Sequence, residues 1–182
     1  MAGLGPAIYA PLERDVWPDV TGSAMTTDSF EDLRDLYQEV ILDHGRRPRH
    51  AHRLEVFDAT AKGDNPMCGD RVQVWVKLTP DNTIAETGFE ARGCAISVAS
   101  ADLMAETVKG RSQTDARTLF ASFREMARTG TCPACDGALS EPLERLQPLA
   151  GVHEYPSRVK CATLAWHALI AALDGGKEAS SE

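Results

Sequence analysis

Three of the five cysteines and one aspartate stand in settings typical of a metal or sulfur site. Cys68 and Asp70 lie in the polar stretch DNPMCGDRV (64–72), directly before a strand-like run. Free cysteine is usually buried in apolar sequence, so a cysteine among Asn, Pro, Gly and Asp is predicted to be accessible. Cys94 (ARGCAIS) stands where a strand-like run meets a helical one, and Cys161 (RVKCATL) opens the last helical stretch.

A helix N-terminus offers free amide donors and a positive dipole, which lower a thiol pKa and favour the thiolate. We expect this setting for Cys94 and Cys161, and we expect Gly93 to give the backbone room to turn beside Cys94. If the ends of these elements converge, they present three sulfur donors, and Asp70 adds an oxygen from the same turn as Cys68. Such a set suits tetrahedral zinc, and the same soft donors suit an iron–sulfur cluster. The alternative is three small apolar residues at packing positions.

The elements that must position these residues follow from hydrophobic periodicity. A first helix is predicted over 26–45, with Asp28 as its N-cap and Gly45 just after its end. The later helical stretches are 94–110, 114–130 (opened by Thr114 or Asp115), 140–149 and 161–176. Strand-like runs cover 54–60, 71–78 and 84–93, and a turn at 79–83 joins the last two. Strands grouped before helices predict an α+β fold, a three-stranded antiparallel sheet with helices packed on one face.

Length and composition limit the classes of protein. A chain of 182 residues predicts one domain, which we expect over 27–175, between a flexible N-terminal tail (1–26) and a C-terminal tail (176–182). The net charge, 19 − 27 = −8, argues against a nucleic-acid partner. An odd number of cysteines and no secretory leader predict reduced thiols and a cytoplasmic protein. No apolar run approaches the ~20 residues that span a membrane.

Four segments resemble the IscU/SufU/NifU-type iron–sulfur cluster assembly proteins. They are LYQEVILDHGRRPRH (36–50), DNPMCGD (64–70), GFEARGCAISVASADLM (88–104) and SRVKCATLAWHAL (157–169), and they occur in that family's order. The resemblance runs from about Phe30 to Leu173. It implies an α+β fold whose sheet and helix ends gather a site at one tip. It also implies the metal ligands Cys68, Asp70, Cys94 and Cys161.

Two departures favour the SufU branch of that family. IscU-type scaffolds carry His directly before the third cysteine and a chaperone-binding LPPVK-like motif, whereas this chain has Lys160 and HEYPSRVK. An inserted helical segment at about 111–150 also resembles SufU. The SufU branch implies zinc and a SufS-type cysteine desulfurase that donates sulfur. The IscU branch implies a scaffold that assembles a [2Fe–2S] cluster, or holds iron, on the same ligands and passes it to recipient proteins.

The reaction that this resemblance implies is attack of a thiolate on a desulfurase persulfide, which makes the protein a sulfurtransferase. We expect Cys68 to accept the sulfur, because a turn flanked by glycine moves more easily than a residue at a helix start, and Cys161 is the second choice. Arg158 and Lys160 flank the site, where cations offset the negative ligands. Solvent-facing charges before a helix are the alternative. A purely structural zinc module is a third hypothesis, disfavoured because such sites prefer four Cys or His ligands.

Several other residues have two interpretations. Cys132 and Cys135 form a C-x-x-C pair, which is either a redox or metal motif or a pair of surface thiols. His44, His50 and His52 form a solvated turn or bind the acidic face of a partner. His167 lies about 240° around the helix from Cys161 and is expected at the core edge or the surface. The tryptophans Trp75 and Trp166 are expected to pack in the core, and Trp17 to dock loosely.

Overall fold

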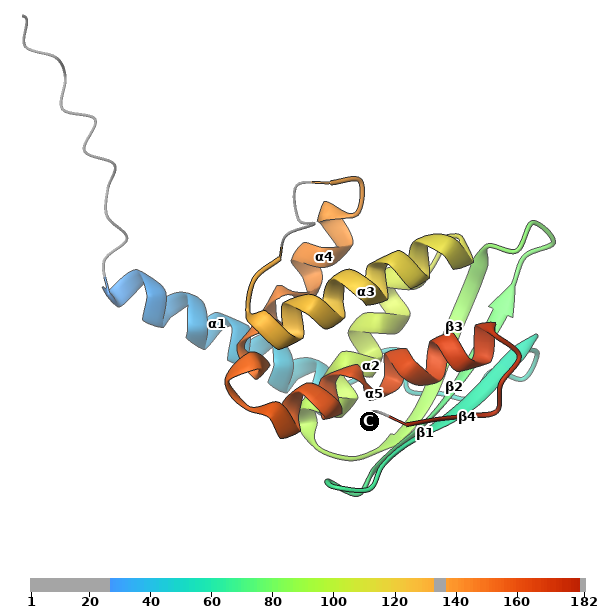
Figure 1. The fold of residues 1–182 in the computed structure, drawn as a ribbon, viewed down its shortest axis with the longest axis horizontal. Helices are drawn as coiled ribbons and strands as arrows, with labels where there is room; N and C mark the ends of the chain where they lie inside the picture. Colours follow the sequence, from blue (N-terminus) through green and yellow to red (C-terminus); the bar gives the residue numbers. More distant parts are fainter. Residues whose placement is uncertain (1–26, 133–136, 181–182) are drawn as a thin grey trace, which may run out of the picture.

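The computed structural model describes residues 27–132 and 137–180. It is an α+β fold in which helices cover one face of a four-stranded sheet (Figure 1). The tail at 1–26, Trp17 and Cys135 lie outside the described residues. The elements, in chain order, are α1 (Thr27–Arg46), β1 (Ala59–Asn65), β2 (Asp70–Leu78), β3 (Ile84–Arg92), α2 (Ala95–Val108), α3 (Gln113–Thr129), α4 (Ser140–Leu146), the 3-10 helix η1 (Gln147–Glu154), α5 (Pro156–Leu173) and β4 (Glu178–Ser180).

The sheet has the strand order β3–β2–β1–β4. β1 pairs antiparallel with β2, and β2 pairs antiparallel with β3. These pairings confirm the prediction of three antiparallel strands. The fourth strand was not predicted: β4 lies in the expected C-terminal tail and pairs parallel with β1 along Lys62–Asp64. Its three residues, Glu178, Ala179 and Ser180, are too few and too weakly apolar to indicate a strand.

The predicted bounds of the first strand, 54–60, are wrong. Leu54 and Val56 alternate with polar residues, but only Leu54 is buried, and β1 begins at Ala59. The segment before β1 instead crosses the outer face of the sheet. A Cβ on Gly88 would lie 2.4 Å from the carbonyl oxygen of His52 and 3.2 Å from Leu54, so Gly88 allows this close crossing. The crossing also covers Trp75, over which the Arg53 guanidinium lies at 5.9 Å.

The core lies between the sheet and the helices. Val72, Val74 and Val76 point from β2 into it, as their alternation predicts. Helix α5 packs on β1 and β2, α2 packs on β3, and α3 packs on α5. α5 approaches β1 closely at Gly63, where a Cβ would lie 3.1 Å from Leu164 Cδ1. No helix within the described ranges is long and apolar enough to cross a membrane.

Several helix ends differ from the predictions. α1 begins at Thr27, before the expected N-cap Asp28, and continues past Gly45. Gly45 is needed for close packing instead, since its Cβ would lie 3.1 Å from Ala95 at the start of α2. The N-cap of α3 is Ser112, whose Oγ accepts a hydrogen bond from the Asp115 amide at 3.1 Å.

The start of α5 bears most directly on function. α5 begins at Pro156, five residues before Cys161, whereas the prediction began the helix at Cys161. Proline at the first turn is favourable because its missing N–H would be unpaired there. Cys161 therefore lies in the second turn of the helix and not at its N-terminus, and the dipole argument for its thiol does not hold.

Candidate metal centre

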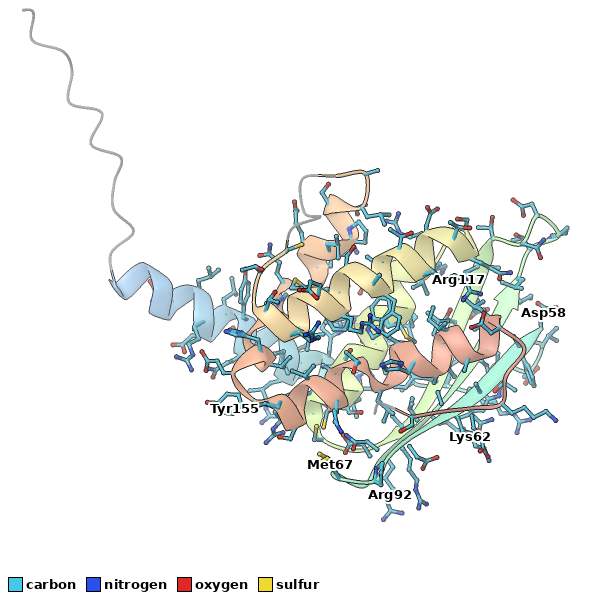
Figure 2. All side chains as sticks on the ribbon, in the orientation of Figure 1. Asp58, Lys62, Met67, Arg92, Arg117 and Tyr155 are labelled. Atoms are coloured by element: carbon cyan, nitrogen blue, oxygen red, sulfur yellow. The ribbon has the colours of Figure 1, made fainter. Side chains whose placement is uncertain are left out.

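The three segments that carry Cys68, Cys94 and Cys161 meet at one end of the sheet. Asp70 begins β2 and Arg92 ends β3 beside it, since the register pairs Arg71 with Arg92. Cys94 then occupies the N-cap position of α2. In the view of Figure 2, Met67 and Arg92 mark this end of the sheet, below the start of α5. The fold thus gathers a strand start, a strand end and two helices around one point.

Asp70, Cys94 and Cys161 form a compact group. One carboxylate oxygen and the two Sγ atoms all lie within 4.8 Å of one another. The Cys94 amide donates to Asp70 Oδ1 at 3.1 Å, so this carboxylate satisfies a free N–H at the start of α2. The Cys94 Sγ lies 3.7 Å from Asp70 Oδ2. The spacing allows all three donors to bind one ion.

Gly93 makes room for the carboxylate. A Cβ at this position would lie 2.7 Å from Asp70 Oδ1 and 2.8 Å from its Cγ. We expected this glycine to ease the turn at Cys94, but its φ is not in the left-handed region that favours glycine. The absent side chain, and not a special backbone conformation, is what the site requires.

Cys161 is buried and is held by polar neighbours. Its Sγ lies 3.7 Å from Asn65 Nδ2 and 3.4 Å from the Ser157 carbonyl oxygen. Burial raises the pKa of the Cys161 thiol far above its usual range, and hydrogen bonds with Asp70 and Cys68 raise it further. We expected a lowered pKa from a helix N-terminus, and that expectation is wrong because the residue lies within α5.

Cys68 lies at the same pocket but outside the compact group. It is exposed, and it lines a cavity of about 560 Å³ together with Asp70, Cys94 and Cys161. The next residue, Gly69, has φ 72°, a left-handed conformation that glycine adopts without strain, and its amide donates to the Asn65 carbonyl oxygen. Of the four expected ligands, three are grouped, and the fourth lies on an exposed turn at the rim, where its thiol still contacts that of Cys161.

Cations surround this pocket. Arg158 and Arg92 line it, and Lys160 Nζ lies 3.6 Å from Met67 Sδ, beside the Cys68 turn. The structure thus places Arg158 at the pocket and Lys160 beside the Cys68 turn. Arg92 was missed, although it stands two residues before Cys94 in the sequence.

A buried carboxylate on α2 was also missed. Asp102 is fully buried, and its Oδ1 accepts the backbone amides of Arg49 and His50, each at 2.8 Å. His44 Nδ1 donates to its Oδ2 at 2.6 Å, and His50 Nδ1 donates to its Oδ1 at 3.0 Å. Asp102 thus joins the end of α1 and the following loop to α2.

Two histidines of this turn have a role that the sequence did not predict. His44 and His50 bind inward to Asp102, whereas neither a solvated turn nor a partner contact implies such a bond. His52 lies 3.7 Å from Glu86 at the surface. The only sequence signal was an aspartate in an otherwise apolar helix, which predicts a partner because a buried charge is costly unless paired.

The remaining candidates lie away from the pocket. His167 packs edge-on against Phe120 with ring centroids 4.9 Å apart, at the core edge as expected. Trp75 and Trp166 are buried packing residues, also as expected. Cys132 packs half-buried against the core.

The donor chemistry fits a thiophilic metal. Thiolates and one carboxylate are ligands that zinc accepts in a tetrahedral arrangement, and a fourth donor on an exposed turn leaves one position easily exchanged. The same sulfur-rich set fits iron in a cluster. Structural zinc sites are usually closed by four Cys or His ligands, whereas this set includes an aspartate and an exposed cysteine, so the arrangement favours exchange of a ligand over permanent structural binding.

Comparisons with known proteins agree with this geometry. Residues 36–162 match the NifU-like N terminal domain family. The chain is 38% identical over 141 residues to "Iron-sulfur cluster assembly scaffold protein IscU" of Streptococcus pyogenes serotype M1, covering 78% of this chain and 84% of that protein. It is 35% identical over 147 residues to "Zinc-dependent sulfurtransferase SufU" of Bacillus subtilis (strain 168), covering 79% and 95%.

Solved structures share the fold. A hypothetical protein matches with a TM-score of 0.69 at 37% identity, covering 78% of this chain and 98% of that one. A protein described as an iron–sulfur cluster assembly scaffold for the SUF system, from Fervidobacterium islandicum AW-1, matches with a TM-score of 0.67 at 28% identity, covering 77% and 98%. The gathered cysteines, the sheet-and-helix frame and these matches lead to one conclusion: the chain belongs to the NifU-like N-terminal domain family, together with proteins named IscU and SufU.

Proposed function

We propose that this protein serves iron–sulfur cluster assembly in the manner of SufU, as a zinc-dependent acceptor of persulfide sulfur from a SufS-type cysteine desulfurase. The observation that carries the proposal is the contrast between Cys68 and the other donors. Asp70, Cys94 and Cys161 are held together in a buried or half-buried group, while Cys68 lies exposed on a glycine turn at its rim. One thiol is available to a partner, and three donors remain to hold a metal.

In the proposed transfer, the Cys68 thiolate attacks the terminal sulfur of the desulfurase persulfide. A bond forms between Cys68 Sγ and that sulfur, the sulfur–sulfur bond of the donor breaks, and the donor cysteine leaves as a thiolate. The exchange needs no oxidant or reductant, because the sulfane sulfur moves between two thiolates. Arg158 and Arg92, which line the pocket, offset negative charge on the incoming persulfide.

Zinc held by Cys68, Asp70, Cys94 and Cys161 would keep the thiols deprotonated and would shield them from oxidation. This role matters most for Cys161, because burial otherwise favours its neutral form. Asp70 would hold the metal when Cys68 is withdrawn, since the Cys94 amide and the space at Gly93 fix its carboxylate.

The second candidate function is a scaffold on which a [2Fe–2S] cluster is assembled and passed to recipient proteins. It is supported by the identity to the S. pyogenes protein named IscU and by the sulfur-rich donor set. Lys160, at the position where IscU-type proteins carry a histidine, favours the first candidate, because its ammonium points to Met67 and, unlike an imidazole, has no lone pair for a metal.

The deciding measurement is the rate of alanine formation from cysteine by a SufS-type desulfurase, with and without this protein at a quantified zinc content. We expect a large zinc-dependent stimulation that is lost in Cys68→Ala and kept in Arg117→Ala, a surface change far from the pocket. Mass spectrometry should find the added sulfur on the peptide that contains Cys68. Absence of stimulation by the zinc-loaded protein would remove this proposal and leave the cluster scaffold.

A further inference from the structure

A second hollow lies beside the metal pocket. It is a groove of about 410 Å³ between α1, η1 and the start of α5. Tyr37 and Ile41 form one wall and Val152 and Tyr155 the other, with Ile96 at its inner end. The Tyr37 hydroxyl donates to Gln147 Oε1 at 3.0 Å and so ties α1 to the start of η1. The groove is mostly apolar, with the size and lining of a site for one large side chain or two smaller ones.

The groove and the metal pocket adjoin at one residue. Arg158 lines both of them, and Ile96 in the groove follows Cys94 by two residues. In Figure 2, Tyr155 at the groove and Met67 beside Cys68 lie along the same side of the molecule. Because the two hollows share Arg158, an extended chain that leaves the groove past this residue enters the pocket that Cys68 lines.

Apolar surface around the groove is left uncovered within the described part of the chain. Tyr155, which lines the groove, is 56% exposed. On the rim of the metal pocket, Met67 is 67% exposed. Tyrosine, methionine and arginine are the residues enriched in the cores of protein interfaces, and clustered apolar exposure of this kind marks a contact site.

The charges of the groove select an acidic occupant. Arg34 and Arg158 line it, and neither makes an ion pair with any residue of the described ranges. Glu154 is the single acidic residue among the lining residues, so the groove carries a net positive charge in a protein of net charge −8. Arginine pairs well with carboxylates because its planar guanidinium donates two parallel hydrogen bonds.

We infer that this groove is the docking site for the persulfide-donating enzyme, which inserts an apolar side chain flanked by carboxylates. The inference rests on the proposed function and deepens it. The apolar side chain fills the groove between α1 and η1, the carboxylates pair with Arg34 and Arg158, and the donor cysteine reaches Cys68 in the adjoining pocket. A few buried anchors carry most of the binding energy in such interfaces, and the charges raise the rate of association.

Gly151 gives the sharpest test. It lines the groove, and a Cβ at this position would meet no atom within 4 Å, so Gly151→Phe introduces a large side chain at the groove from a backbone position with free space around its Cβ. Arg34→Glu reverses a groove charge without touching the metal pocket. The matched charge control is Arg117→Glu, on α3 and away from the groove, where only an exposed ion pair with Asp174 is lost. The probe is the SufS-type desulfurase, and calorimetry measures its binding to the full zinc-loaded chain.

We expect Gly151→Phe and Arg34→Glu to weaken desulfurase binding at least tenfold, with zinc content unchanged, and Arg117→Glu to bind within twofold of the wild type. Raising the salt concentration should weaken wild-type binding more than that of Arg34→Glu. Equal binding by all four proteins would overturn the groove assignment and leave the proposed function standing. No binding by the wild type would overturn the proposed function and the groove assignment together. A wild-type dimer that Gly151→Phe dissociates in sedimentation would instead assign the groove to a second copy of this chain.

Discussion

Gly93 and Asp70 are packed so closely that no side chain fits between them: a Cβ on Gly93 would lie 2.7 Å from Asp70 Oδ1. Gly93→Ala should therefore displace the carboxylate and its hydrogen bond from the Cys94 amide. We expect a zinc affinity at least tenfold lower, measured by competition with a chromogenic chelator. Gly151→Ala is the matched control, because its Cβ meets no atom within 4 Å. Equal affinities in the two variants would contradict the proposed role of Asp70 as a ligand.

Two substitutions of Asp70 separate its charge from its hydrogen bond. Asp70→Asn keeps an oxygen that accepts from the Cys94 amide but loses the negative charge, whereas Asp70→Ala loses both. We expect both variants to bind zinc more weakly, and only Asp70→Ala to lose about 1–3 kcal/mol of stability in the metal-free protein, since a part-buried N–H is then unpaired. Urea unfolding with chelator present measures this difference. A loss of stability in Asp70→Asn as large as in Asp70→Ala would show that the charge itself holds the fold.

Asp102 should contribute to the stability of the fold and not to zinc binding. Replacing it with Ala leaves two backbone amides and two imidazole N–H groups without their acceptor. We expect a loss of about 3 kcal/mol in the free energy of unfolding, because breaking a buried charged network is among the costliest single changes. Asp35→Ala on the exposed face of α1 is the control and should change stability by less than about 0.5 kcal/mol. Zinc stoichiometry should stay the same, and a parallel loss of zinc would mean that this network also positions Cys94.

Local patterns predicted those parts of the fold that depend on neighbouring residues. The alternation of Val72, Val74 and Val76 predicted β2, and the turn at 79–83 predicted the hairpin. The start of α5 was missed because Pro156 follows a stretch that reads as a loop, although η1 occupies most of it. β4 is held by pairing with β1, a contact that its three residues, Glu178, Ala179 and Ser180, do not predict by any local pattern.

The sequence predicted which residues form the candidate site but not the surroundings of each side chain. The spacing and family resemblance named Cys68, Asp70, Cys94 and Cys161, yet the sequence did not say which of them is buried. Burial depends on long-range packing, such as that of Asn65 on β1 against Cys161 on α5. The pairing of His44 and Asp102 joins positions 58 residues apart and has no local pattern.

Zinc uptake should release protons, because burial raises the pKa of Cys161 and keeps its thiol neutral in the metal-free protein. The wild type should release about one proton more per zinc than Cys161→Ser, measured by calorimetry in buffers of different ionisation enthalpy. The metal-free fold should also lose stability above about pH 8.5, since the unfolded chain ionises this thiol at its ordinary pKa and the folded chain does not. Equal proton release by the two proteins would mean that Cys161 is already a thiolate before zinc binds.

His167 should make the metal-free protein less stable in mild acid. Burial lowers the pKa of this imidazole, and the nearby positive charge of Arg124 lowers it further. The unfolded chain therefore takes up a proton near pH 6.5, while the folded chain does so only at lower pH, so stability falls as the pH drops through this window. We expect His167→Gln to reduce the difference in unfolding free energy between pH 7.5 and pH 5.5, measured by urea titration with chelator. All other titrating groups are shared by the two proteins, so an unchanged difference would mean that His167 is protonated as readily in the fold as in the unfolded chain.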